Sequence, residues 1–341
     1  MNTDKNNFDK PILSVSNLKV GFETVKGSVT AVDGVSFDLM RNQILGVVGE
    51  SGCGKTVMTR AVMGLLRTPP AVVTASKIEF EKPDGDVVDL KGLNNKGFQS
   101  IRGKEISMIF QEPMTSLNPL FTIGNQLTEH VFVHEKTSRQ ETNKRALELL
   151  RQVGIPSPEL RMKDYPHQLS GGMRQRIMIA MAMICKPSLL IADEPTTALD
   201  VTIQAQILKL LKSIQARDHT SIIFISHDLA VISMIADVVI VMYQGRIVEQ
   251  GTPRQVFQNP QHPYTIGLIN SLPRMDQSRK LGLKPIKGGM PDPYNPPKGC
   301  GFHPRCPDVT DQCRSTVPEL EHTGKGRRVA CWHLRPVRIE I

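Results

Sequence analysis

Short apolar runs alternate with amphipathic segments along most of the chain. Four runs rich in branched aliphatic residues predict strands, at 44–48, 189–192, 221–225 and 238–243. The first is expected to be buried on both faces, and the second is also expected to be buried. Three segments with apolar residues at helical spacing follow or separate these runs, at 56–66, 201–215 and 229–235. Strands that alternate with helices predict an α/β protein with a mostly parallel sheet and helices on both faces.

Two regions depart from this alternation. Helical spacing continues through 123–153 and 173–184, which predicts a helical insertion at about 115–186. Near the N-terminus the pattern is that of strands, at 12–20, 35–39 and across the β-rich stretch 76–110. Asp84-Gly85 adds a turn signal within that stretch.

A glycine-rich turn after the strand at 44–48 carries a candidate phosphate site. Residues 49–56 fit G-x-x-x-x-G-K-[ST] without a gap, between an apolar strand and a helix. Glycines let backbone N–H groups curl around phosphate oxygens, Lys55 reaches the β- and γ-phosphates, and the Thr56 hydroxyl ligates Mg²⁺. The simpler alternative is a glycine turn that only caps a helix. The predicted nucleotide-binding residues here are Gly49, Glu50, Ser51, Gly52, Cys53, Gly54, Lys55 and Thr56.

Two later strand ends carry residues that suit phosphate chemistry. The strand at 189–192 delivers Asp193 to its polar end, where the carboxylate can hold Mg²⁺, and Glu194 can orient or deprotonate the attacking water. A strand ending in Asp-Glu is common on its own, but a magnesium nucleotide needs a carboxylate opposite the phosphate loop. His227 follows the strand at 221–225 and can contact the γ-phosphate at the same sheet edge. Its alternative is a purely structural histidine.

Composition changes along the chain. The 341 residues carry a net charge of +9, and the segment from residue 256 holds 13 Lys or Arg against 7 Asp or Glu, 12 of the 24 prolines and four of the six cysteines. This shift predicts two domains, 1–255 and 256–341. A hydrophobic content of 40% without an apolar run long enough for a membrane span is typical of a soluble protein. The polar N-terminus lacks the pattern of a secretory signal, so a cytoplasmic protein is expected.

One heptapeptide makes the combination of motifs specific enough to indicate a protein family. Residues 169–175, Leu-Ser-Gly-Gly-Met-Arg-Gln, precede the Asp-Glu strand and then Ser226-His227. In this order the set closely resembles the nucleotide-binding subunit of ABC transporters, over about residues 12–255. The resemblance implies a P-loop NTPase core with a parallel sheet, an antiparallel β subdomain and a helical subdomain. It also implies ATP and Mg²⁺ as cofactors and ATP hydrolysis coupled to transport.

The resemblance further implies roles for individual residues. Gln111 looks like the Q-loop glutamine, which senses Mg²⁺ beside the membrane partner, so the implied Mg²⁺ residues are Thr56, Gln111 and Asp193. Ala198-Leu199-Asp200 looks like the loop that crosses between two ATP sites, and Phe22 stands where many family members have an adenine-stacking Tyr. The implied catalytic residues are Lys55, Gln111, Glu194 and His227.

Ser170, Gly171 and Gly172 look like the signature that caps ATP bound to the other subunit. Ser170 is expected to cap a helix that begins at about Gly171, so that its hydroxyl and the free backbone N–H groups face an anion. Without a second chain, such a sequence is only a helix start. The resemblance implies that two cassettes clamp two ATP molecules and that the closing motion drives the membrane partners.

The C-terminal segment resembles a narrower group. His-Pro-Tyr-Thr at 262–265 resembles the C-terminal region of ATPase subunits from oligopeptide and dipeptide importers. The D-type subunit of these importers can carry four cysteines, associated with a [4Fe–4S] cluster. The corresponding residues here are Cys300, Cys306, Cys313 and Cys331.

Four thiols in a cytoplasmic chain suit an iron–sulfur cluster or zinc better than disulfides. The lack of a C-x-x-C pair weakens the zinc alternative, and unliganded thiols also stay open. His303 and His333 are possible further ligands. Four nearby arginines are expected to stabilise an anionic thiolate centre, namely Arg305, Arg314, Arg327 and Arg328.

The resemblance implies a peripheral protein at the cytoplasmic face of the membrane. Its partners would be a second ATPase, often a related F-type subunit, two permeases and an extracytoplasmic peptide-binding protein. The surface at 111–127, with Met114, Leu117, Leu120 and Phe121, is expected to receive permease helices, unless it only packs within the helical insertion. A nickel importer ATPase is the main alternative. A non-transport ABC ATPase acting on nucleic acid is a weaker one, because such proteins usually carry two cassettes or a long coiled coil, so no nucleic-acid partner is expected.

Overall fold

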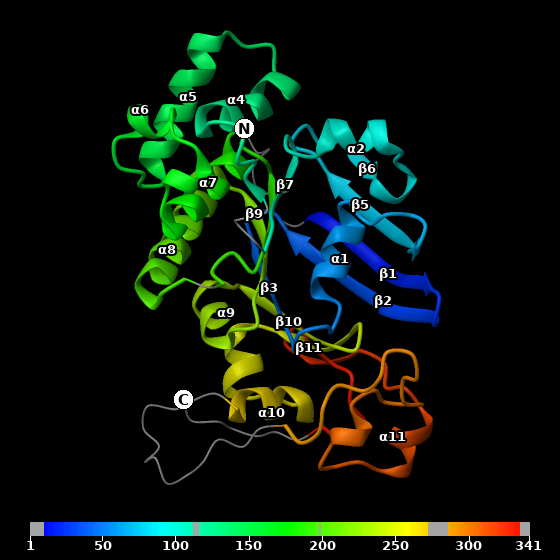
Figure 1. The fold of residues 1–341 in the computed structure, drawn as a ribbon. Coiled ribbons are helices and arrows are strands. Elements are labelled where there is room, and N and C mark those ends of the chain that lie inside the picture. Colours follow the sequence, from blue (N-terminus) through cyan, green and yellow to red (C-terminus); the bar gives the residue numbers. More distant parts are fainter. Residues whose placement is uncertain (1–9, 112–115, 198, 272–285, 335–341) are drawn as a thin grey trace, which may run out of the picture. The chain divides into compact units, whose positions relative to one another are not determined.

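The structure, a computed structural model, describes residues 10–111, 116–197, 199–271 and 286–334 (Figure 1). These residues form two compact units. The first unit contains residues up to 14 together with 38–44 and 79–225, and the second contains 15–37, 45–78 and 226 onward. The boundary predicted near residue 255 falls inside the second unit, and the division into domains 1–255 and 256–341 stays a prediction.

The first unit is built on three parallel strands: β7 (Ile106–Ile109), β8 (Leu189–Asp193) and β9 (Ser221–Ile225). β8 lies between the other two, and every residue of the three strands is buried, as continuous apolar runs predict. The shared direction brings the carboxyl ends of β7, β8 and β9 to one edge. The same unit contains the antiparallel pairing of β5 (Lys77–Glu81) with β6 (Val87–Asp89).

Most of the helices in the described part of the chain lie in this first unit. They are α2 (Asn95–Ile101), α4 (Ile123–His134), α5 (Arg139–Gln152), α6 (Pro158–Arg161), α7 (Gly171–Met183) and α8 (Val201–Asp218). α4, α5 and α7 pack against one another, and this cluster is the predicted helical insertion (Figure 1). The helical pattern at 123–153 is divided in two because the Ser138 hydroxyl accepts from the backbone N–H of Glu141 and starts α5. The β-rich stretch 76–110 also contains a helix, α2, capped by Asn94.

The second unit contains a mixed sheet. β3 (Ile44–Val48) lies parallel to β10 (Val238–Tyr243), and β10 pairs antiparallel with β11 (Arg246–Gly251). The C-terminal segment continues this sheet, because β13 (Arg327–Val329) pairs with β11 and β12 (Glu321–Gly324) pairs with β13. Its helices are α1 (Lys55–Val62), α9 (Leu229–Ile235), α10 (Pro263–Asn270) and α11 (Asp311–Ser315).

Two long N-terminal strands, β1 (Pro11–Thr24) and β2 (Gly27–Met40), pass through both units. In the second unit β1 pairs antiparallel with β4 (Ala71–Thr74). Short helical turns complete the described chain at Leu90–Gly92, Pro166–Gln168, Arg254–Gln258 and His303–Arg305. Within the described ranges, we find no helix with the length and apolar character that a membrane crossing needs.

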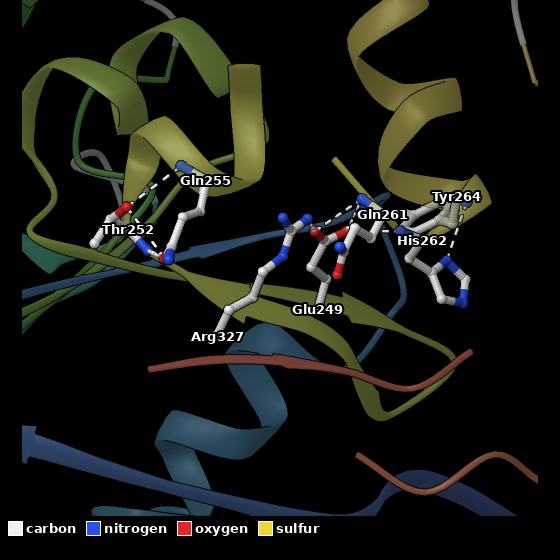
Figure 2. A network of polar contacts seen from close by, with 7 residues as sticks. All are labelled: Glu249, Thr252, Gln255, Gln261, His262, Tyr264 and Arg327. Atoms are coloured by element: carbon white, nitrogen blue, oxygen red, sulfur yellow. Dashed lines mark hydrogen bonds and ion pairs between the residues drawn. The ribbon is translucent and has the colours of Figure 1, made fainter. Parts of the chain in front are cut away.

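A buried ion pair holds the C-terminal segment to the sheet. Figure 2 shows Glu249 of β11 between the Arg327 guanidinium of β13 and the backbone N–H groups of Gln261 and His262. The Glu249 side chain is fully buried and that of Arg327 is 5% exposed. Neither charge could stay buried alone, because an unpaired charge in the interior costs several kcal/mol, on the order of 3–5. This network was not predicted from the sequence.

His262 begins α10 in the same region. Its Nδ1 accepts from the backbone N–H of Tyr264 at 3.0 Å, so the neutral ring caps the helix (Figure 2). Burial lowers the pKa of His262 from 6.5 to about 3. Between these two pH values only the unfolded chain binds the proton, so acid favours unfolding. The contribution of His262 to stability is therefore complete above pH 6.5 and lost progressively as the pH falls toward 3.

We expect His262→Asn to flatten the acid limb of the stability curve by about 1.4 kcal/mol per pH unit below pH 6.5. Asn keeps an acceptor at the helix start but has no proton to gain. Urea denaturation of the full chain between pH 7.5 and 5 measures the slope. The exposed His322, changed to Asn, serves as the control and should keep the wild-type slope. An unchanged slope in His262→Asn would show that another group carries the acid sensitivity.

Candidate functional site

The phosphate loop lies where the sequence predicts it, between β3 and α1 in the second unit. All five residues of β3 are buried, and α1 starts at Lys55. Gly54 occupies the N-cap position, and glycine has no side chain to cap the helix, so the first backbone N–H groups of α1 stay available to an anion. Ser51 and Gly52 are exposed at the tip of the loop.

Two of the loop glycines cannot be replaced without moving the backbone. Gly49 and Gly54 have φ values of 154° and 103°, which L residues rarely adopt. A Cβ on Gly49 would lie 2.3 Å from the Met242 carbonyl oxygen, and one on Gly54 would lie 2.3 Å from that of Ala31. The loop is therefore packed against the backbone on two sides, which fixes its curvature.

Lys55 is held by the loop itself. Its Nζ donates to the Gly49 carbonyl oxygen at 2.8 Å and to that of Glu50 at 3.0 Å. The Cys53 thiol lies 3.7 Å from the same Nζ, and burial raises the pKa of this thiol. Cys53 is therefore a packing residue under the loop rather than a reactive thiol.

Three further predicted residues lie in the second unit. Thr56 is half-buried in the first turn of α1, and His227 is exposed just after β9. Phe22 lies in β1 opposite Ala71 of β4 and is half-buried. Adenine stacking by Phe22 and the contact of His227 with the γ-phosphate stay predictions.

In the first unit, the end of β8 brings two predicted residues together. Asp193 is fully buried as the last residue of the strand. Glu194 follows it, and the Glu194 Oε2 accepts from the Gln111 side-chain amide at 3.2 Å. Gln111 comes from the segment after β7, so the neighbouring strands β7 and β8 deliver the two side chains to one place.

Glu194 is held in an unusual conformation. Its φ of 49° lies in the left-handed region, which costs a non-glycine residue about 1–3 kcal/mol. The Glu194 backbone N–H donates to the Ile225 carbonyl oxygen at the end of β9, and the Thr197 hydroxyl donates to Glu194 Oε2 at 2.9 Å. Thr197 was not predicted, although a hydroxyl three residues after Glu194 is a signal for such a contact. These contacts orient the Glu194 carboxylate.

The signature segment forms the predicted helix start. α7 begins at Gly171, and the Ser170 hydroxyl accepts from the backbone N–H of Met173 at 3.3 Å. Ser170 and Gly171 are both exposed, and a Cβ on Gly171 would meet nothing within 4 Å. Asp200 caps α8 through the N–H of Ile203. Ala198, in the crossing-loop prediction, and Met114, in the permease-surface prediction, lie outside the described residues.

The four C-terminal cysteines share one pocket in the second unit. Cys300, Cys306, Cys313 and Cys331 all line it, together with Phe302, Trp332, His303 and His333. The Cys331 Sγ accepts from the backbone N–H of His333 at 3.4 Å, and none of the four forms a disulfide. Burial raises the pKa of Cys306 and of Cys331 to about 11, so these thiols stay protonated unless a cation binds.

The donor arrangement bears on the kind of group that fits this pocket. Among the residues that the structure describes, no three His, Cys, Asp or Glu side chains are gathered as a single metal ion requires. The four thiols that line the pocket form a donor set that suits an iron–sulfur cluster and also structural zinc.

The arginines do not serve this pocket in the way predicted. Arg305 forms an ion pair with Glu50 of the phosphate loop, and Arg327 pairs with Glu249. Arg328 donates to Gln250 and to the Ser36 carbonyl oxygen. The expectation of arginines gathered around the thiols is therefore wrong for these three, because each has an acceptor elsewhere.

The fold and these motifs define an ATP-binding cassette. The ABC transporter family model matches residues 32–197. The dimeric bacterial ABC transporter cassette MJ0796 superposes with a TM-score of 0.61 and 25% identity, over 71% of this chain and 99% of that one. The cassette cbiO1 from Clostridium perfringens, part of the ABC transporter complex cbiONQ, superposes with a TM-score of 0.59 and 28% identity, over 73% and 91%. The predicted fold class is confirmed.

Matches that cover more of the chain identify the subgroup of ABC transporter proteins to which it belongs. The family model for the C-terminal region of oligopeptide/dipeptide transporters matches residues 248–313. The dipeptide transport ATP-binding protein DppD of Bacillus subtilis is 51% identical over 94% of both chains, and OppD, the oligopeptide transport protein of the same organism, is 49% identical over 95% of this chain and 89% of its own. DppD of Escherichia coli is 45% identical over 94% and 96%. This chain belongs to the family of ATP-binding subunits of oligopeptide and dipeptide ABC transporters. These comparisons give no support for an iron–sulfur cluster.

Proposed function

We propose that this protein hydrolyses ATP to energise the import of peptides through a membrane ABC transporter. The observation that carries the proposal is the combination of a full cassette with a C-terminal region of the oligopeptide/dipeptide transporter type. Curated relatives named for dipeptide and oligopeptide transport match almost the whole chain. These names favour peptides over nickel as the cargo, and they favour transport over an activity on nucleic acid.

The roles of the site residues follow from their chemistry. The phosphate loop and Lys55 bind the triphosphate through backbone N–H groups and one ammonium. Thr56 and Asp193, with Gln111, would hold Mg²⁺, which supplies charge neutralisation for the phosphates. Glu194 accepts a proton from the attacking water, in an orientation supported by the hydrogen bonds from Gln111 and Thr197. His227 donates to the γ-phosphate.

A second cassette completes each site. The exposed Ser170 and Gly171 suit contact with ATP on another subunit, because the start of α7 presents N–H groups and the positive end of the helix dipole. Asp200 and its neighbours form the loop between the two sites. The second ATPase is an F-type paralogue, and the complex includes two permeases and an extracytoplasmic peptide-binding protein.

The permeases contact an apolar surface of the first unit. Leu120 is 79% exposed and Phe121 is 51% exposed, just before α4. Leu117 is buried, so only part of the predicted 111–127 surface is available for docking. Two exposed apolar side chains side by side in the sequence suit a cytoplasmic helix of a membrane partner. The protein therefore acts at the cytoplasmic face of the membrane.

Reconstituted transport tests the proposed function. The chain is purified with its permeases and second ATPase, placed in liposomes, and supplied with the binding protein and labelled peptides. Uptake of di- to hexapeptides should require ATP. Uptake of Ni²⁺ without peptide uptake would overturn the peptide assignment, and ATP-independent uptake would overturn the coupling.

We propose further that Cys300, Cys306, Cys313 and Cys331 hold a [4Fe–4S] cluster. The support is the shared pocket of the four thiols, because four cysteines are the donor set that iron–sulfur clusters use. Cys53 and Cys185 are buried elsewhere and are not ligands.

Anaerobic purification tests the metal. We expect about four iron atoms and four sulfides per chain, following the cluster composition, and a broad absorption of visible light. Cys306→Ser should lose most of both, whereas Cys185→Ser should keep them. Stoichiometric zinc without iron, or metal-free protein, would overturn the cluster.

A further inference from the structure

Glu50, the second residue of the phosphate loop, forms an ion pair with the C-terminal segment. Arg305 Nη1 lies 2.6 Å from Glu50 Oε2, and Arg305 Nη2 lies 3.0 Å from Glu50 Oε1. This is the two-point geometry in which an arginine binds a carboxylate most strongly. The Arg305 side chain is only 5% exposed and that of Glu50 is 28% exposed, so the pair is largely shielded from water.

The backbone of Glu50 is held as well. Its N–H donates to the Tyr264 hydroxyl at 2.8 Å, and its carbonyl oxygen accepts from Lys55 Nζ at 3.0 Å. Tyr264 belongs to α10 and is fully buried. The contacts with Tyr264 and Arg305 come from residues more than 200 positions away in the sequence.

Packing fixes the two residues that make these contacts. The ring of Phe302 lies 5.3 Å from that of Tyr243 and 5.4 Å from that of Tyr264, measured between centroids. Arg305 is three residues further along the same turn, and its Nε donates to the Lys287 carbonyl oxygen at 3.2 Å. Its guanidinium also lies 5.9 Å from the centre of the Tyr243 ring. These contacts hold the Arg305 guanidinium in position independently of its ion pair with Glu50.

The charge of Glu50 makes this contact consequential for the nucleotide. A carboxylate in the phosphate loop repels a triphosphate, and the repulsion is strong where water is scarce. Pairing with Arg305 cancels that charge, and the Tyr264 hydroxyl fixes the backbone at the start of the loop. Removal of Arg305 alone would leave the carboxylate uncompensated beside the phosphates.

We propose that Arg305 and Tyr264 are positioning residues of the ATP site, and that the C-terminal segment thereby sets the affinity of the phosphate loop for ATP. The inference rests on the proposed binding of ATP by this loop. Arg305 lies between Cys300 and Cys306, so the turn that lines the cysteine pocket also contacts the nucleotide site.

A competing explanation is that the ion pair only fastens the C-terminal segment to the phosphate loop. The two explanations differ in what happens when only the Glu50 charge is removed. If Arg305 acts by cancelling the charge of Glu50, Glu50→Gln alone should keep or raise the affinity for ATP, because the repelling carboxylate is gone. If the ion pair acts only as a fastener, Glu50→Gln breaks it and should lower the affinity for ATP as much as Arg305→Gln does.

The test uses the purified complex with Arg305→Gln, Arg305→Lys, Tyr264→Phe, Glu50→Gln and the double variant Glu50→Gln/Arg305→Gln. Binding of a fluorescent ATP analogue with Mg²⁺ gives Kd, and phosphate release gives KM and kcat. The exposed Arg254, changed to Gln, is the matched control for removal of one positive charge.

We expect Arg305→Gln to raise Kd and KM for ATP about tenfold with kcat within about twofold of wild type. Arg305→Lys keeps the positive charge but not the two-point contact, so its Kd for ATP should rise only about threefold. Tyr264→Phe removes one hydrogen bond and should also raise the Kd about threefold. In the Glu50→Gln background, Arg305→Gln should change Kd by less than about twofold.

Each outcome is decisive. Unchanged Kd and KM in Arg305→Gln would overturn the inference, as would a Kd for ATP that Glu50→Gln alone raises as much as Arg305→Gln does. Wild-type complex that binds no ATP would instead overturn the proposed function itself.

Discussion

Replacing Glu194 by Gln is expected to reduce steady-state ATP hydrolysis by the assembled complex at least about 100-fold, with ATP binding retained. The carboxylate is the proposed base, and general-base catalysis contributes about 10²- to 10⁴-fold. Gln is isosteric and keeps one oxygen that can accept from Gln111 and Thr197, so the local geometry should survive. What is lost is the capacity to take a proton from water.

Phosphate release by the complex and binding of a fluorescent ATP analogue separate the two effects. Glu148→Gln provides the matched control, because it makes the same Glu-to-Gln change at an exposed position on α5 that is not one of the site residues. The control should hydrolyse ATP at the wild-type rate. Hydrolysis by Glu194→Gln within about threefold of wild type would remove Glu194 from the catalytic role and leave it as an orienting residue.

The parts of the site that depend on local sequence were predictable. The phosphate loop, the Asp193–Glu194 strand end and the Ser170 helix cap each follow from a short run of residues whose backbone preferences agree. The pairing of Gln111 with Glu194 was also accessible, because parallel neighbouring strands bring their carboxyl ends to one edge. The buried parallel strands followed from their apolar runs for the same reason.

The contacts that depend on distant residues were not predictable. Arg305 lies 255 residues from Glu50, and no local pattern connects them. Its position beside two cysteines suggested the wrong partner, since an arginine near thiols is also expected to stabilise a thiolate. Glu249 and Arg327 raise the same difficulty, because a single charged residue in an apolar strand does not reveal which later residue will neutralise it.

Some errors had a signal in the sequence. The break in the helical stretch 123–153 is marked by Ser138 followed three residues later by Glu141, a common helix start.

The strand β11 had no clear signal in the sequence. It is short, and its buried residue Glu249 interrupts the apolar pattern, so periodicity alone does not identify it. The tertiary pairing with β10 and β13 outweighs the weak local preference.

Gly171→Asp is expected to suppress hydrolysis by the assembled complex at least about 100-fold, while the chain folds normally and binds ATP at its own phosphate loop. The structure supports normal folding, because a Cβ at Gly171 meets nothing within 4 Å and its backbone is helical. An aspartate in the first turn of α7 even suits the helix dipole. The same charge would repel a triphosphate bound to the opposing cassette.

The comparison that isolates this effect is between the single chain and the complex. The single Gly171→Asp chain should unfold at the wild-type temperature and bind the ATP analogue with wild-type affinity. The complex that contains it should release phosphate far more slowly than the wild-type complex. Gly289→Asp is the control, because an added Cβ there also meets nothing and the residue is exposed. Full hydrolysis by the Gly171→Asp complex would mean that no second cassette's nucleotide approaches α7, and the composite-site mechanism would then fail for this subunit. Loss of ATP binding by the isolated chain would point instead to a role for α7 within its own cassette.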